Sequence, residues 1–222
     1  MRRPLAADPV FEALAGAILR GKYKPTSALP PERELSALFN VSRLIVRQAL
    51  HRLREMGLVR GGQGGQNIVL DPDGSSDPRI VALTMELAPE KTDQQDVIER
   101  QLLGGTIMLE LAQGRISDAE LDALDRLLTS MDQNQDRREI GAFETAFWTA
   151  IAAATGNKIL LREARWWFEM LDRQPERASW FYDRPELRLT IYRMVVDALR
   201  ARDKSAAPRF LEAVRPVLSA RA

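Results

Sequence analysis

The pattern of apolar and polar residues divides the first seventy positions into three short helices and a hairpin. Apolar residues recur three and four positions apart in segments 8–21, 30–40 and 42–57, the spacing expected of one buried helix face. Residues 58–70 hold two short β-prone runs on either side of a glycine-rich stretch, a pattern typical of a β-hairpin. The predicted order is therefore three helices followed by a hairpin.

Capping and turn residues mark the boundaries of the second and third helices. The second helix is expected to bury Leu35 and Leu38 and to end at Asn40, a residue type that tolerates the left-handed conformation. Ser42 is expected to cap the third helix, and Gly57 to end it. The short connection predicts a helix-turn-helix. The buried stripe of the third helix is predicted to consist of Val46, Ala49, Leu50 and Leu53.

The rest of the chain shows only helical patterns. A polar, turn-rich segment at 71–78 predicts a hinge, so we expect one domain at 1–70 and a second at 79–222. Ser117 and Glu120 form a capping box. One helix is expected to be capped by Thr92 and to bury a stripe of Val97, Leu103, Ile107 and Leu111; others are expected near Arg138, Asn157, Pro185 and Asp203. The predicted fold class is mainly α, with six or seven helices in the second domain.

Composition narrows the classes of function. The chain has no cysteine and a single histidine, His51, which excludes disulfides, thiol nucleophiles and cysteine-ligated zinc. No apolar run is long enough to span a bilayer, and no secretion signal is evident at the N-terminus, so a cytoplasmic protein is expected. A phosphate-cradling glycine loop and a nucleophile elbow are also missing, which argues against an enzyme.

Charge is distributed unevenly along the chain. Residues 1–70 hold 11 Lys/Arg against 5 Asp/Glu, a balance of +6, whereas the remaining residues hold 21 against 26, a balance of −5. A basic first domain fits a polyanionic partner, and the acidic remainder would repel one. The coincidence of the basic segment with a helix-turn-helix pattern favours DNA as the partner.

Three runs in the first domain carry a specific resemblance. They are 29–36 (LPPERELS), 41–43 (VSR) and 46–50 (VRQAL). Together they resemble the winged helix-turn-helix of the GntR family of bacterial transcription regulators, in which the hairpin is the wing. The resemblance implies DNA contacts by Arg33, Ser42, Arg43, Arg47, Gln63 and Gly64. Ile45 and Gln48 depart from the usual threonine and glutamate, which implies an altered operator preference.

The second domain resembles the effector domain of the FadR subfamily, the FCD type. The resemblance rests on segments 143–148 (FETAFW), 154–157 (ATGN) and 191–203, which ends in ALRARD. Many members of that subfamily hold a divalent metal with one aspartate and three histidines. By an approximate alignment, Glu144 falls on the aspartate position, and the three histidine positions are taken by Trp148, Tyr192 and Val214. Because no histidine follows His51, we expect neither a metal nor another cofactor.

An apolar pocket is the expected replacement for the metal site. If Trp148 and Tyr192 line the former metal cavity beside Glu144, the pocket suits an organic or acyl-type acid. Arg100 falls on an early-helix arginine that often meets the effector carboxylate in similar domains. The alternative, which the sequence leaves open, is that the rings are core packing and that Arg100 is a surface charge.

The expected function is therefore an effector-responsive transcriptional regulator, with repression favoured. A homodimer is expected because the two-fold symmetry of a dimer matches a palindromic operator. A cytoplasmic protein that binds DNA is also expected to associate with the nucleoid. Effector binding would act on the two DNA-binding domains through the 71–78 segment. The alternative is a constitutive DNA-binding dimer whose second domain only dimerises.

Overall fold

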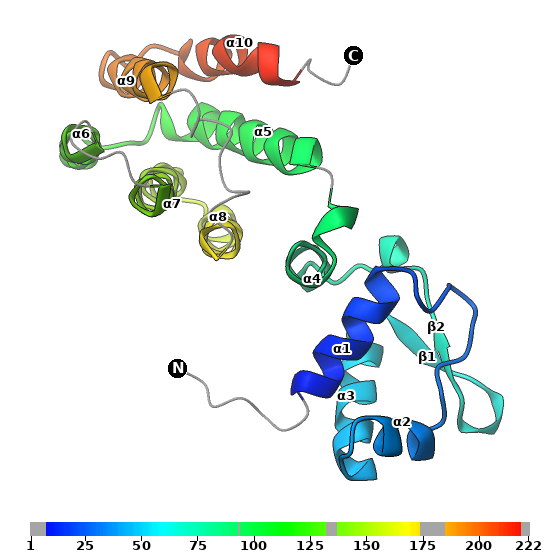
Figure 1. The fold of residues 1–222 in the computed structure, drawn as a ribbon. Coiled ribbons are helices and arrows are strands. Elements are labelled where there is room, and N and C mark those ends of the chain that lie inside the picture. Colours follow the sequence, from blue (N-terminus) through cyan, green and yellow to red (C-terminus); the bar gives the residue numbers. More distant parts are fainter. Residues whose placement is uncertain (1–7, 93, 132–136, 174–184, 219–222) are drawn as a thin grey trace. The chain divides into compact units, whose positions relative to one another are not determined.

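The computed structural model describes residues 8–92, 94–131, 137–173 and 185–218 (Figure 1). The chain forms two compact units, Met1–Thr92 and Asp93–Ala222, which we call the N-terminal unit and the helical unit. Among the described residues the only sheet is a two-stranded hairpin, and the remaining regular structure is helical. The expected fold class, a three-helix winged domain followed by an all-α bundle, is confirmed.

The N-terminal unit begins with the expected three helices and hairpin. Helix α1 packs against α3, and α2 packs against α3 as well. The two strands pair antiparallel with Val59 opposite Val69. Their ranges are α1 Asp8–Leu19, α2 Glu32–Leu38, α3 Arg43–Glu55, β1 Val59–Gly61 and β2 Asn67–Val69, with a 3-10 turn at Gln63–Gly65.

The residues predicted to end α2 and to cap α3 do so, but one predicted core residue of α2 is exposed. The Ser42 side chain accepts a hydrogen bond from the Ile45 amide at 3.4 Å, and Asn40 takes the left-handed conformation with φ 50°. Leu38 was predicted to be buried, but it is 68% exposed. Phe39, the residue that follows α2, packs against the core instead.

A fourth helix, α4 (Arg79–Leu87), belongs to the N-terminal unit and packs against α1. Ile80 and Ala88 are buried in the same core cluster as the first three helices. The preceding segment is also held there, because the Ser75 hydroxyl donates a 2.8 Å hydrogen bond to the Met56 carbonyl. The compact units thus divide after Thr92, and residues 71–78 lie within the first unit.

The helical unit contains six described helices. Helix α7 packs against α5, α6 and α8, while α10 packs against α5 and α9 (Figure 1). No described helix is long and apolar enough to cross a membrane. The ranges are α5 Gln94–Ala112, α6 Asp118–Met131, α7 Arg137–Ala154, α8 Lys158–Asp172, α9 Pro185–Arg200 and α10 Ala206–Leu218.

The predicted capping box forms in this unit, and a helix begins near Asn157 as expected. The predicted Thr92 cap does not form, because the Thr92 hydroxyl has no hydrogen-bond partner among the described residues. Glu120 accepts a 2.7 Å hydrogen bond from the Ser117 amide, and Asn157 caps α8 by accepting from the Ile159 amide at 2.9 Å. Leu103 and Ile107 were expected in the buried stripe of α5, but they are 49% and 56% exposed. Helix α5 buries Val97 as expected, but its apolar residues extend around most of its circumference, and it also buries Ile98, Leu102, Met108 and Leu109.

Candidate DNA-binding surface and effector site

The predicted DNA-contacting residues of the helix-turn-helix all reach the surface. Arg33 lies in the first turn of α2, and Arg43 is the first residue of α3; both are exposed. Exposed Ser42 directly precedes α3 and caps it. An exposed arginine at the N-terminal end of a helix of this kind can reach guanine edges in a major groove.

Arg47 is the one member of this set that is held by an acidic neighbour. Its Nε lies 2.7 Å from Glu32 Oε2, so the ion pair joins α3 to the start of α2. The Arg47 side chain remains 64% exposed and the Glu32 side chain 29%. The pair orients Arg47 within the two-helix motif, and it places a negative charge beside the surface that would meet DNA.

Arg54 connects α3 to the hairpin. Its Nε and Nη2 both donate to the Oδ1 of Asn67, at 3.0 and 2.7 Å. Asn67 is only 3% exposed and lies at the start of β2. The contact therefore fixes the hairpin to the last turns of α3, and it sets the position of the wing relative to the helix that precedes it.

The tip of the hairpin carries the two remaining predicted DNA contacts. Gln63 and Gly64 lie in the 3-10 turn and are exposed. Gly64 has φ 67°, a conformation that favours glycine, and a Cβ placed there would meet no atom within 4 Å. Glycine is therefore required by the backbone conformation, while the open surroundings leave room for close approach of a phosphate backbone.

An exposed apolar residue beside Arg43 was missed by sequence reasoning. Leu44 is 65% exposed at the start of α3, whereas Ile45, to which the altered operator preference was attributed, packs against the core. An exposed aliphatic side chain here can contact a thymine methyl group. The signal was the helical period, because Leu44 lies two residues before Val46 and therefore on the opposite face of α3 from the buried stripe.

Glu144, Trp148 and Tyr192 come together inside the helical unit. The Tyr192 hydroxyl donates a 2.9 Å hydrogen bond to Glu144 Oε1, and both residues are buried. Trp148 packs edge-on to Tyr192, with ring centroids 6.2 Å apart, and edge-on to Phe210 at 5.3 Å. The three residues are thus part of a close-packed aromatic cluster that also contains Phe143 and Phe147.

The aromatic cluster contains Glu144, Trp148 and Tyr192, three of the four positions that the resemblance predicts to correspond to metal ligands. Gly105 of α5 permits the packing, because a Cβ there would lie 2.9 Å from Cη2 of Trp148. Val214, the fourth aligned position, is fully buried. Within the described ranges no three His, Cys, Asp or Glu residues gather as metal ligands would.

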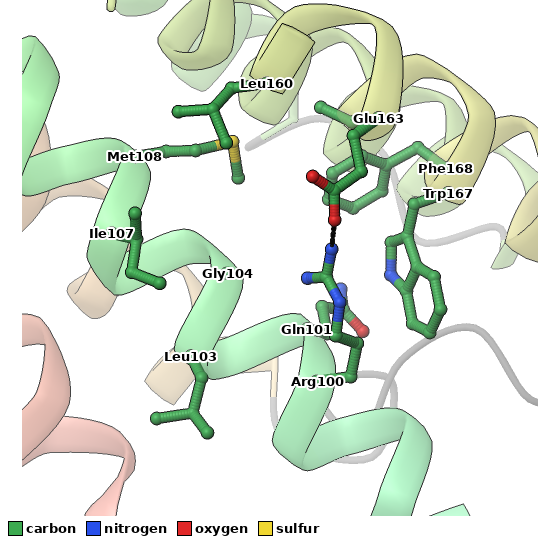
Figure 2. Close-up of a pocket in the computed structure, with 11 residues that line it drawn as sticks. Arg100, Gln101, Leu103, Gly104, Ile107, Met108, Leu160, Glu163, Trp167 and Phe168 are labelled. Carbon is green, nitrogen blue, oxygen red and sulfur yellow. Dashed lines mark hydrogen bonds and ion pairs between the residues drawn. The ribbon is translucent and has the colours of Figure 1, made fainter. Parts of the chain in front are cut away.

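Arg100, the fourth predicted effector residue, lies elsewhere, at a cavity between α5 and α8 (Figure 2). The cavity has a volume of about 300 Å³. Arg100 forms an ion pair with Glu163, and its guanidinium lies over the Trp167 ring, 5.1 Å from the centroid. Neither Trp148 nor Tyr192 belongs to its lining, which is formed by Arg100, Gln101, Leu103, Gly104, Ile107, Met108, Leu160, Glu163, Ala164, Trp167 and Phe168.

The two units correspond to two families of protein domain. Residues 6–66 match the model of bacterial regulatory proteins of the gntR family, and residues 85–214 match the FCD domain. The second match begins inside α4, so the FCD pattern overlaps the end of the N-terminal unit.

Relatives with both regions are named as regulators. The HTH-type transcriptional regulator Rv0494 of Mycobacterium tuberculosis is 31% identical over 93% of this chain and 85% of its own length. The HTH-type transcriptional repressor NanR of Citrobacter rodentium is 28% identical over 95% of this chain and 84% of its own. The solved structure of Lar, described as controlling the Listeria monocytogenes agr system, has a TM-score of 0.56 at 15% identity, covering 98% of each chain, which shows a shared fold.

Proposed function

This chain belongs to the gntR family of bacterial regulatory proteins and carries an FCD domain, and from that membership we propose a homodimeric repressor, of the FadR subfamily, that releases a palindromic operator when a small organic acid binds. It is a transcriptional regulator with a DNA-binding N-terminal unit. The single observation that carries the proposal is the exposed arginine surface of α2 and α3, joined in one chain to a helical FCD unit.

The proposed DNA contacts divide into two kinds. Arg43 and Arg47 recognise base edges, because α3 presents them near its N-terminal end. Arg33, Ser42 and the wing residues Gln63 and Gly64 contact the phosphate backbone and position the helix. Dimerisation supplies the second half-site, since one winged helix contacts too few base pairs for useful specificity.

The helical unit is proposed to carry the effector response. Arg100 supplies a cation for an organic acid, and the Glu144–Trp148–Tyr192 group is the second candidate contact surface. Neither metal nor cofactor is proposed, and no catalytic role is assigned. Because 71–78 is held to the N-terminal unit, we place the joint that transmits the response after α4, where the compact units divide.

The test begins with the operator. In vitro selection of DNA fragments by the purified full-length protein, followed by sequencing, should yield an inverted repeat with two half-sites. Analytical ultracentrifugation of the complex should give two chains per site. Selection of unrelated sequences, or of single half-sites bound by one chain, would contradict the proposed dimer. A panel of organic acids added to the preformed complex then tests for release.

A further inference from the structure

One apolar side chain lies exposed on the face of α3 that carries polar residues. Leu44, the second residue of α3, is 65% exposed. We propose that Leu44 determines operator specificity by contacting the 5-methyl group of a pyrimidine in each half-site. The pyrimidine is thymine, and 5-methylcytosine, which carries the same methyl group, can replace it. The inference rests on the DNA-binding function proposed above, and it adds a base class and the residue that recognises it.

The helical period places Leu44 beside other exposed residues of α3. Residues three, four and seven positions further along a helix share its face, and in α3 these are Arg47, Gln48 and His51. All three are exposed, whereas Val46 is buried on the opposite face. Every residue of α3 is described by the structure, and Leu44 is the only apolar one among its exposed residues. A large apolar side chain thus stands alone on a polar helix face.

The neighbours of Leu44 in the sequence lie in different surroundings. Arg43 is exposed and charged, while Ile45 packs against the core of the N-terminal unit. The Ile45 amide also donates to the Ser42 hydroxyl that caps the helix. An altered operator preference was attributed to Ile45 from the sequence, but core packing occupies that side chain. The apolar surface that α3 offers to DNA near its N-terminal end is therefore that of Leu44.

Leucine can select a base because it has no hydrogen-bonding group. In the major groove thymine presents a methyl group at C5, whereas adenine, guanine and cytosine present only hydrogen-bond donors or acceptors. Contact between this methyl group and leucine removes two apolar surfaces from water, which is favourable. Contact with a polar edge would take that edge out of water without giving it a partner, which is unfavourable. The same side chain thus favours a methylated pyrimidine and disfavours the other bases.

Leu38 provides a comparison within the same motif. It is the last residue of α2 and is 68% exposed, so its exposure nearly equals that of Leu44. In a helix-turn-helix the second helix enters the major groove, while the first crosses the sugar–phosphate backbone, which presents no base methyl group. The two leucines therefore share side chain and exposure, and they differ in the part of the DNA that their helices meet.

Replacement of single thymines in the selected operator by deoxyuridine tests the proposal. Deoxyuridine keeps the base pair and lacks only the methyl group. Fluorescence anisotropy with the full-length protein should reveal one thymine in each half-site whose methyl group strengthens binding about fourfold, the effect expected for one buried methyl group. Cytosine and 5-methylcytosine are then compared at this position, and the methylated base should bind more tightly by a similar factor.

Variants of the two leucines assign the methyl contact to a side chain. Leu44→Ala should bind the thymine and deoxyuridine operators equally, and the double-mutant cycle isolates the contact between side chain and methyl group. Leu44→Met keeps an apolar side chain and should retain part of the methyl dependence. Leu38→Ala is the matched control and should retain all of it. Because both leucines are exposed, the alanine variants should unfold at the same urea concentration as the wild type.

Three outcomes would overturn the proposal while leaving the proposed function intact. The first is a selected operator in which no thymine depends on its methyl group. The second is methyl dependence that persists in Leu44→Ala, and the third is its loss in Leu38→Ala. If Leu44→Ala also dissociates the dimer in ultracentrifugation while methyl dependence persists, Leu44 contacts a second copy of the chain. Failure of operator selection would instead overturn the proposed function, and the Leu44 contact with it.

Discussion

Several of the predicted contact residues differ between the two units in whether the protein itself supplies a partner. Arg33 and Arg43 of the N-terminal unit are exposed, whereas Glu144 and Arg100 of the helical unit are paired with Tyr192 and Glu163. In the proposed function, the DNA contacts of Arg33 and Arg43 would therefore need no rearrangement of these side chains. A ligand carboxylate at Arg100 would have to exchange with the Glu163 carboxylate. The proposal therefore places the ligand-dependent change in the helical unit.

The largest effect should follow from removing a ring of the aromatic cluster. Trp148→Ala deletes a 3% exposed side chain packed on Tyr192 and Phe210, so we expect a loss of about 3–5 kcal/mol in the free energy of unfolding of the helical unit. All four tryptophans of the chain lie in that unit, Trp180 outside the described residues. Urea denaturation followed by tryptophan fluorescence therefore reports on it selectively.

Trp166→Ala is the control for this prediction. Trp166 is half-buried on α8 and pairs with Trp167, with centroids 6.2 Å apart, so its removal leaves a smaller void. The loss should be clearly smaller than for Trp148→Ala. If the two variants lose the same stability, the greater burial of Trp148 in the aromatic cluster does not determine its contribution to stability.

A smaller effect, on binding rather than folding, is expected for Arg43→Ala. The side chain is exposed at the start of α3, so the variant should fold as the wild type does and lose about 1–3 kcal/mol of operator affinity. Fluorescence anisotropy with the selected operator and its single-base-pair variants measures both affinity and discrimination. Relaxed discrimination at one position would identify a base contact.

Arg126→Ala serves as the matched control for Arg43→Ala. It removes the same charge from an exposed position of α6, in the other unit. Equal loss of affinity in both variants would mean that only the net charge matters, and that the arginine surface of the N-terminal unit is not a contact site. The dependence of affinity on salt should fall in Arg43→Ala only if the side chain also neutralises a phosphate.

Most helices of the N-terminal unit could be predicted from the sequence, because capping residues, turn residues and apolar stripes act over only a few positions. Ser42, Asn40 and the stripe around Val46 each act within a few residues, and all three are found as expected. Leu38 was misplaced because α2 has only two turns, too few for periodicity to separate it from Phe39. Helix α4 was missed, since the polar 71–78 segment before it suggested a break between domains.

The site in the helical unit depends on contacts between distant residues. Arg100 and Glu163 are 63 positions apart, and Glu144 and Tyr192 are 48 apart, so no local pattern links them. Sequence analysis did single out Arg100, Trp148 and Tyr192. It could not show that Trp148 and Tyr192 pack together while Arg100 lines a cavity between α5 and α8, because these contacts join residues on different helices.

A third, smaller effect concerns the one paired arginine of the DNA-binding surface. Glu32→Gln removes the carboxylate that lies 2.7 Å from Arg47 Nε. An exposed pair contributes about 0–1 kcal/mol, so stability should change little. We expect affinity for all DNA sequences to rise slightly, because a negative charge is lost, and discrimination to fall, because Arg47 is no longer oriented. The same anisotropy titrations with operator and unrelated DNA measure both quantities.

Glu34→Gln is the control for Glu32→Gln, because it removes an exposed negative charge from the same turn of α2. It should raise affinity for all sequences without changing discrimination. If both variants discriminate as the wild type does, Glu32 does not orient Arg47. Arg47 would then resemble Arg43, and the contrast between paired and unpaired arginines in this unit would have no functional consequence.

The smallest effect is expected at the capping box of α6. The side-chain hydrogen bond from Ser117, together with its backbone amide, lowers the pKa of Glu120 from its usual value of 4.5. A carboxyl group whose pKa is lower in the folded state stabilises the fold above its unfolded pKa, and that contribution disappears as the pH falls below 4.5 through the folded value. Glu120→Gln should therefore be slightly less stable than the wild type at pH 7, and the difference should shrink in acid.

Urea denaturation followed by tryptophan fluorescence at pH 7 and below pH 4.5 measures this convergence. Ser117→Ala removes the partner hydroxyl and should cost about 1 kcal/mol. If the two side chains act through the same hydrogen bonds, the double variant should lose less than the sum of the single losses. Additive losses at pH 7 would instead show that Glu120 acts through the interaction of its charge with the N-terminus of α6, independently of Ser117.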